Sequence, residues 1–187
     1  APGQPVGEAA PLKDKLRDAT GDRLTPSHTI RRGRRFGYYV SNRLIAGGTD
    51  PSGWRLPAPA LEAAVAAAVA RHLADQATRH AVLAAPSAPE AATGATRVAD
   101  LSRRIAGDGI AAAAPLVAAV GIGADRLRIQ LAGAAIARAT DLPQHGLAAA
   151  LLDLEAPFAC RRRGVEMKIV AGDWIPSPDA TPPARAP

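Results

Sequence analysis

The chain has 187 residues, enough for one domain or slightly more. Alanine accounts for 45 of them, whereas Leu, Ile, Val and Phe together make up about a fifth of the chain. This low content of large apolar side chains predicts a thin hydrophobic core. Its uncharged stretches fall short of the roughly 20 apolar residues of a membrane-spanning helix, it shows no secretory signal, and its single cysteine, Cys160, excludes an internal disulfide. The net charge of +6 lies mainly in the first 55 residues, which carry ten Lys and Arg against five acids; this favours an anionic partner, nucleic acid before a membrane surface, unless it reflects a basic composition alone.

The first elements in chain order are a tail and a hairpin. Residues 1–11 are rich in Pro and small side chains, and we expect them to be disordered. Residues 12–45 are predicted to form a ribbon-like basic hairpin. Within it, two runs rich in Thr, aromatic and β-branched residues, 24–29 and 35–40, flank a turn in which Gly33 supplies a positive φ.

A helix is expected next. Residues 46–56 form a Gly- and Pro-rich linker, and residues 57–85 then predict one long alanine-rich helix that Pro59 opens. Its apolar side chains recur at helical spacing and form a stripe: Leu61, Val65, Val69 and Leu73.

The remainder is predicted to be a loose connector, residues 86–95, a small α+β region with two hairpins, residues 96–172, and a disordered Pro-rich tail, residues 173–187. The first hairpin lies within 116–131, and in its second strand three apolar side chains alternate with polar ones: Leu127, Ile129 and Leu131. The second hairpin spans 156–170. We therefore expect the α+β class, with short ribbon-like hairpins and one long helix.

Few residues suit catalysis or cofactor binding. Ser27 and His28 are neighbours on a strand and point to opposite faces, so they cannot pair directly. The four histidines lack the spacing of a zinc site, and there is no glycine-rich phosphate loop. Cys160 is either a buried structural residue or a thiol whose pKa the adjacent Arg161 lowers. We expect no enzymatic activity, metal, cofactor or small-molecule substrate.

Two basic segments predict contacts with a polyanion. In the first, guanidinium groups would bind phosphates and tyrosines would stack or donate hydrogen bonds: Arg31, Arg32, Arg34, Arg35, Tyr38 and Tyr39. The second is the last hairpin, with Arg161, Arg162, Arg163 and Lys168. In the alternative interpretation both are ordinary solvated turns, with Phe36 and Tyr38 packed on the core.

The segment GDRLTPSHTIRRGRRFGYYVSNRLI, Gly21–Ile45, resembles the serine site-specific recombinases of the large resolvase/invertase-like group, in their zinc β-ribbon region. The resemblance continues through the helix at 57–84, the strand Ala124–Leu131 and APFACRRRGVEMKIV, Ala156–Val170. With one cysteine, the chain is similar to a cysteine-poor subgroup without metal. Phe36 and Gly37 stand where that subgroup usually has Tyr and a basic residue.

The resemblance implies a DNA-binding, non-catalytic fragment of a serine recombinase, without the serine catalytic domain, that acts on double-stranded DNA in recombination and integration. The single cysteine favours a reducing cytoplasm, DNA binding would make the chain nucleoid-associated, and no membrane partner is expected. Two alternatives stay open. The helix at 57–84 would pair recombinase subunits through its Leu and Val stripe, or the chain is a truncated gene product without independent function.

Overall fold

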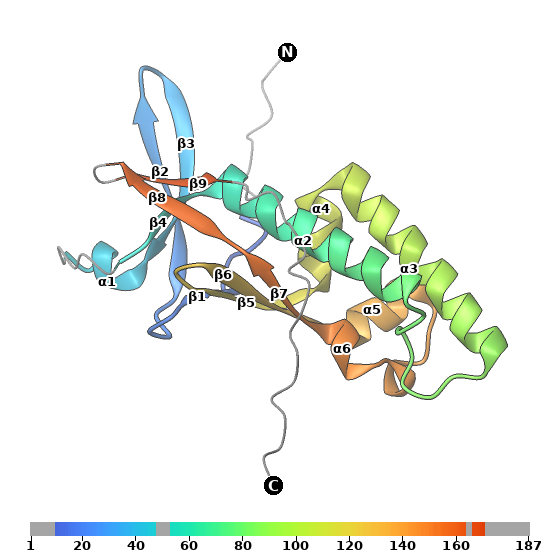
Figure 1. The fold of residues 1–187 in the computed structure, drawn as a ribbon. Coiled ribbons are helices and arrows are strands. Elements are labelled where there is room, and N and C mark those ends of the chain that lie inside the picture. Colours follow the sequence, from blue (N-terminus) through green and yellow to red (C-terminus); the bar gives the residue numbers. More distant parts are fainter. Residues whose placement is uncertain (1–9, 48–52, 164–165, 171–187) are drawn as a thin grey trace, which may run out of the picture.

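The computed structural model describes residues 10–47, 53–163 and 166–170, with side chains up to residue 160. The fold belongs to the α+β class, as predicted, and its described strands form three sheets (Figure 1). The largest sheet has the strand order β1-β5-β6-β7, in which only β1 and β5 run parallel. Its strands are β1 (Leu16–Asp18), β5 (Val117–Ile122), β6 (Arg126–Leu131) and β7 (Asp153–Pro157).

Two smaller sheets hold the basic segments. The first has the order β2-β3-β4 and consists of β2 (Leu24–Arg31), β3 (Arg34–Ser41) and β4 (Arg55–Pro57). Because β4 occupies the end of the stretch predicted as a linker, the hairpin gains a third strand at its base. The second is an antiparallel pair of β8 (Ala159–Arg163) and β9 (Glu166–Val170), which confirms the pairing expected for the last hairpin.

Helices connect and cover these sheets. The two long ones are α2 (Ala58–Thr78) and α3 (Ala88–Asp108), which pack against each other. The short ones are α1 (Asn42–Ile45), α4 (Ile110–Ala113), α5 (Gly133–Thr140) and α6 (Ala149–Leu152), with 3₁₀ turns η1 (Ala114–Leu116) and η2 (Gln144–Gly146). None of the helices in the described ranges is long and apolar enough to cross a membrane.

The core follows from the alternation on β6. Leu127, Ile129 and Leu131 are buried, whereas the intervening Arg126, Arg128 and Gln130 are exposed, as expected for a strand with one wet face. The buried face joins the apolar residues of α2 and α3 in one continuous cluster that also includes small alanines. Burial of the small side chains compensates in part for the low content of large aliphatic residues.

The helical region differs from the prediction at one place. The residues predicted as a loose connector, 86–95, fall largely within α3, and α2 ends at Thr78 and does not reach residue 85. Pro89 lies in the first turn of α3, where a missing N–H costs nothing, and the carboxylate of Glu90 accepts hydrogen bonds from the N–H and hydroxyl of Ser87 at 2.8 and 2.6 Å. His80, with φ of 52°, closes α2 in the left-handed conformation.

Candidate nucleic-acid interface

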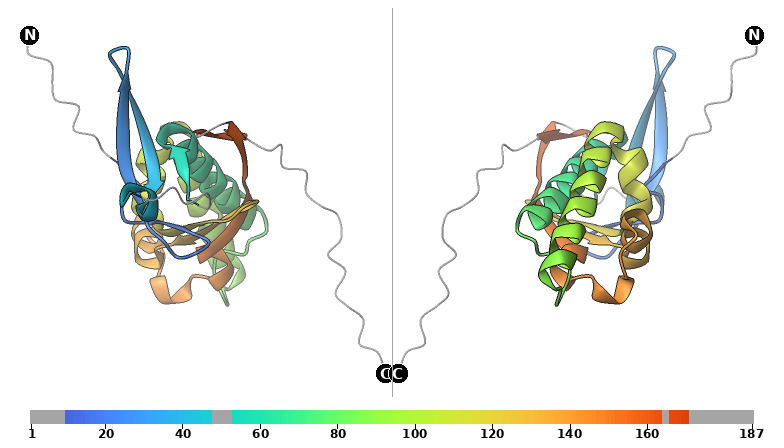
Figure 2. Two further views of the ribbon diagram at one scale, coloured as in Figure 1. Left: turned by 90° about the vertical axis from the view of Figure 1, so that its left-hand side faces the viewer. Right: turned by 90° about the vertical axis from the view of Figure 1, so that its right-hand side faces the viewer.

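The β2–β3 hairpin projects beyond the other described helices and strands (Figures 1 and 2). Its strands pair from Leu24 opposite Ser41 up to Arg31 opposite Arg34. The two turn residues, Arg32 and Gly33, both have positive φ, 48° and 73°. A turn of this kind matches the right-handed twist of the flanking strands, and Gly33 adopts it without strain. The predicted hairpin and its glycine turn are therefore confirmed, with longer strands than expected.

Exposed positive charges are concentrated at the tip of the hairpin. The segment Leu24–Val40 contains no Asp or Glu. All four arginines predicted to bind phosphate are exposed there: Arg31, Arg32, Arg34 and Arg35. The guanidinium Nη2 of Arg35 lies 3.3 Å from Nδ1 of His28 on the neighbouring strand. Since guanidinium groups stay charged at any relevant pH, this tip attracts polyanions.

The two tyrosines have a different role from the predicted one. Tyr39 is fully buried: its hydroxyl donates to Oε1 of Glu62 at 2.8 Å and accepts a hydrogen bond from the N–H of Leu12 at 3.3 Å. Burial, followed by the bond with Glu62, raises the pKa of Tyr39. Tyr38 is 8% exposed and lies under the guanidinium of Arg55, 4.4 Å from its ring centre. The prediction that these tyrosines contact DNA is therefore wrong for the folded chain; they anchor the hairpin.

Two exposed apolar side chains at the tip are absent from the predicted site. Ile30 is 69% exposed and Phe36 is 41% exposed. The alternative interpretation placed Phe36 with Tyr38 on the core, but only Tyr38 packs there. Ile30 pairs with Arg35, and Phe36 pairs with Thr29. Successive residues of a strand point to opposite faces, so Ile30 and Phe36 lie on opposite faces of the ribbon.

A buried carboxylate fixes the base of the hairpin. Oδ1 of Asp18 accepts hydrogen bonds from the N–H and hydroxyl of Thr20, at 2.9 and 2.6 Å, and from the N–H of Asp22 at 3.1 Å. Oδ2 accepts from the hydroxyl of Ser41 at 3.2 Å and lies 2.8 Å from Nη1 of Arg43. Because Ser41 ends β3 and Arg43 follows it, these contacts tie the hairpin to β1.

The second predicted basic surface lies at the limit of the described side chains. Strand pairing places Arg161 opposite Lys168, Arg162 opposite Met167 and Arg163 opposite Glu166. The side chains of all these residues are outside the described part of the chain. β9 lies beside β4, the third strand of the sheet that carries the basic hairpin. The two basic segments are thus brought to neighbouring elements of the fold.

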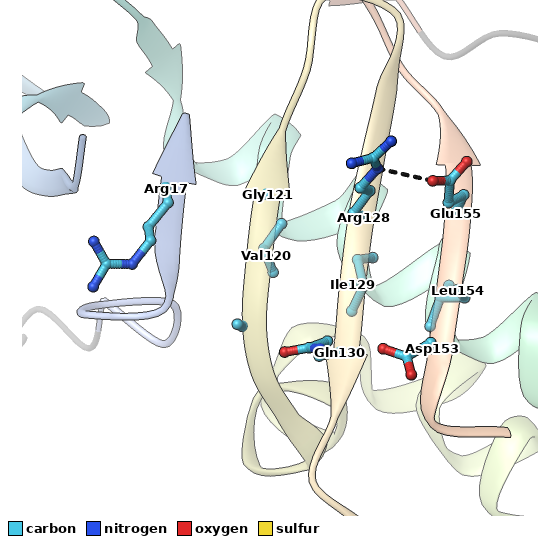
Figure 3. Close-up of a pocket in the computed structure, with 10 residues that line it drawn as sticks. Arg17, Val120, Gly121, Arg128, Ile129, Gln130, Asp153, Leu154 and Glu155 are labelled. Atoms are coloured by element: carbon cyan, nitrogen blue, oxygen red, sulfur yellow. Dashed lines mark hydrogen bonds and ion pairs between the residues drawn. The ribbon is translucent and has the colours of Figure 1, made fainter. Parts of the chain in front are cut away.

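The exposed face of the four-stranded sheet contains an open hollow of about 570 Å³. Figure 3 shows Gly121 of β5 between Arg17 of β1 on one side and Arg128 with Glu155 on the other. Nε of Arg128 donates to Oε1 of Glu155 at 2.8 Å. The charged residues that line the hollow are two arginines, Arg17 and Arg128, and two acids, Asp153 and Glu155. Their charges balance, so the hollow does not extend the positive surface of the hairpin.

The cysteine and the histidines give no sign of reactive chemistry. Cys160 is partly buried against the core, and burial raises the pKa of its thiol, contrary to the lowering by Arg161 that the sequence suggested. A protonated thiol is a poor nucleophile, which favours the structural interpretation. Nε2 of His72 lies 3.1 Å from the carbonyl oxygen of Leu151. Among the residues that the structure describes, no group of His, Cys, Asp or Glu is arranged to hold a metal.

The apolar stripe of α2 does not offer a surface for subunit pairing. Its four members are fully buried within this chain: Leu61, Val65, Val69 and Leu73. They belong to the same core as α3 and the large sheet. A pairing of subunits through this stripe, one of the alternatives that the sequence left open, would require α2 to leave the core.

Comparison with models of known protein families, with curated proteins and with solved structures finds no match to this chain.

Proposed function

We propose that this chain binds duplex DNA through the tip of its β2–β3 hairpin, as a non-catalytic DNA-binding region of a serine site-specific recombinase. The observation that carries the proposal is a projecting, acid-free ribbon with four exposed arginines: Arg31, Arg32, Arg34 and Arg35. The resemblance of Gly21–Ile45 to the recombinases supports the assignment to that family.

The chemistry of the tip suits phosphate binding. A guanidinium group donates two parallel hydrogen bonds to a phosphate and is less strongly hydrated than an ammonium group, so it loses little on leaving water. A protruding ribbon can bring such groups to both strands of a duplex, whereas a flat basic surface meets one side only. The basic β8–β9 segment, beside β4, is proposed to add a second set of phosphate contacts through Arg161, Arg162, Arg163 and Lys168.

Fluorescence anisotropy with a labelled duplex, at several salt concentrations, tests the proposal. The double variant Arg32→Ala/Arg34→Ala is expected to weaken binding about tenfold or more near 0.1 M salt. It should also reduce the slope of log Kd against log salt by roughly 1.8, if each arginine neutralises one phosphate.

The matched control is Arg103→Ala/Arg104→Ala, which removes the same charge from exposed arginines of α3. Helix α3 lies away from the β2–β3 hairpin (Figure 1), so this variant should bind almost as the parent chain does. An equal loss in both variants would mean that net charge, and not the hairpin, determines affinity. Unchanged affinity and slope in the hairpin variant would refute the proposed contact.

A further inference from the structure

The large sheet has an open edge at β7. Among the described strands of this sheet β7 is outermost, beside β6 (Figure 3). The N–H of Phe158 donates to the carbonyl oxygen of Asp125 at 2.8 Å, so these two residues form a hydrogen-bonded pair of the ladder. Such pairs alternate along antiparallel strands, and the backbone groups of Asp153 and Glu155 therefore point away from β6. An edge of this kind accepts another strand unless something covers it.

A pocket of about 180 Å³ lies between this edge and α2. Its lining includes two apolar side chains, Ala68 of α2 and Leu154 of β7. Arg71 also lines the pocket; it is exposed and has no acidic partner among the described residues, whereas Asp75 pairs with Arg79 at 3.1 Å. The pocket thus offers an apolar contact and an uncompensated positive charge to a strand that lies along β7.

The chain itself returns to this edge. β9 runs antiparallel to β8, and its last residue, Val170, lies opposite Ala159, which comes two residues after the end of β7 at Pro157. β9 also lies beside β4, which leads directly into α2. Figure 1 shows β9 and β6 on opposite sides of β8. Residues that continue β9 in the same direction would therefore run along β7, on the side of α2, without any connecting loop.

The sequence after β9 suits such a strand. The register of the β8–β9 pair, continued beyond β9, gives three further pairs: Asp173 with Ala156, Trp174 with Glu155 and Ile175 with Leu154. Paired residues share a face of the sheet, so Ile175 would join Leu154 at the pocket and Asp173 would approach Arg71. Trp and Ile are enriched in strands, and the first proline of the tail, Pro176, follows directly after them.

We propose that residues 171–175 dock on the open edge of β7 as a fifth strand of the four-stranded sheet, with Asp173 and Ile175 in the pocket beside α2. Trp174 then exchanges two backbone hydrogen bonds with Glu155. A second copy of the chain is a poorer occupant, because pairing of two β7 edges would bring the carboxylates of Asp153 and Glu155 from both copies together. The docked segment ties the end of β9 to the large sheet, and this arrangement is independent of DNA binding.

Amide hydrogen exchange of the whole chain, measured for single residues by NMR, tests the docking. The N–H of Glu155 has no partner at an open edge but is bonded in the docked state, so it should exchange at least about tenfold more slowly than an unpaired amide. Trp174→Pro removes one bond to Glu155 and disrupts the strand, and it should return the Glu155 amide to fast exchange. The matched control is Ala180→Pro, which places a proline beyond the docked stretch and should leave the exchange unchanged.

A charge reversal tests the register. Asp173→Lys places a second cation beside Arg71 and should speed the exchange of the Glu155 amide about threefold. Combined with Arg71→Glu, the exchange should return to the parental rate. If Asp173→Lys has no effect, or if the double variant does not restore the rate, the placement of Asp173 beside Arg71 is wrong.

The outcomes are distinct. The amide of Ala156 points to β6 and should stay protected in every variant, which establishes that the sheet is folded. Fast exchange at Glu155 in the parent chain, or slow exchange that persists in Trp174→Pro, would refute the docking. Protection of Glu155 that is lost when the parent chain is diluted would assign the edge to a second copy instead.

Discussion

Replacement of Leu73 by alanine is expected to lower the free energy of unfolding by about 3 kcal/mol. Leu73 is fully buried on α2, within the core shared with α3 and the large sheet. Truncation removes its apolar contacts and leaves a cavity that the surrounding side chains fill only in part. Urea unfolding followed by far-UV circular dichroism measures the effect. The urea concentration at the unfolding midpoint should fall, whereas the slope of the unfolding free energy against urea concentration should not change.

The adjacent residue provides the control. Ala74 is exposed on the same helix, so Ala74→Gln should change the stability by less than about 0.5 kcal/mol. This pair also distinguishes a core helix from a subunit interface. Parental stability in Leu73→Ala, combined with loss of self-association in sedimentation, would contradict the packing of α2 and revive subunit pairing through its stripe.

Replacement of Asp18 by alanine is expected to cost about 3 kcal/mol at neutral pH. The carboxylate of Asp18 is inaccessible to solvent and accepts hydrogen bonds from Thr20, Asp22 and Ser41 in addition to its ion pair with Arg43. Its removal leaves several donors in this region without their acceptor. Asp22→Ala is the control, because Asp22 also pairs with Arg43 but is 24% exposed, and it should cost clearly less.

The contribution of Asp18 is expected to depend on pH. Burial alone would raise its pKa, but the hydrogen bonds from Thr20, the charge of Arg43 and the N–H of Asp22 outweigh burial and hold the pKa below its usual value. A carboxyl with a lower pKa in the folded state stabilises the fold fully above its unfolded pKa of about 4, and this contribution is lost as the pH falls through the folded pKa.

The stability difference between the parent and Asp18→Ala should accordingly be largest near pH 6 and shrink below about pH 4. Urea unfolding of both proteins at a series of pH values from 6 to 3 measures this difference. A difference that stays constant over the series would show that Asp18 stabilises the fold without its charge.

Local patterns were sufficient to predict the hairpins. Two runs rich in Thr, aromatic and β-branched residues flank Gly33, and they predict the turn and the pairing of β2 with β3. The alternation of Leu127 and Ile129 with Arg128 similarly predicts which face of β6 is buried. Period-two patterns and turn residues act over a few positions, so they are visible in the sequence.

Some errors arose where long-range packing decides, but the missed start of α3 had a local signal. Pro89 fits either a break in a helix or the first turn of the next one, and Ser87 three residues before Glu90 has the spacing of a capping box, which favours the second. Tyr38 and Tyr39 lie only a few residues after Arg35, but whether their side chains are buried depends on where the hairpin leaves the core. Gly37 marks that point, since a Cβ there would lie 3.5 Å from Ala58 of α2. Beyond it, Ile30 and Phe36 become exposed.

The parallel pairing of β1 with β5 has a consequence for biosynthesis. Leu16 lies opposite Val120, so the strand that supports the hairpin base finds its sheet partner about a hundred residues later. Until β5 has been synthesised, β1 has no strand to pair with in this sheet. The long loop that must close between the two strands also slows folding. A shortened chain that ends before β5 would contain every arginine of the hairpin tip. It would lack the strand that pairs with β1, and β1 holds the base of the hairpin in place.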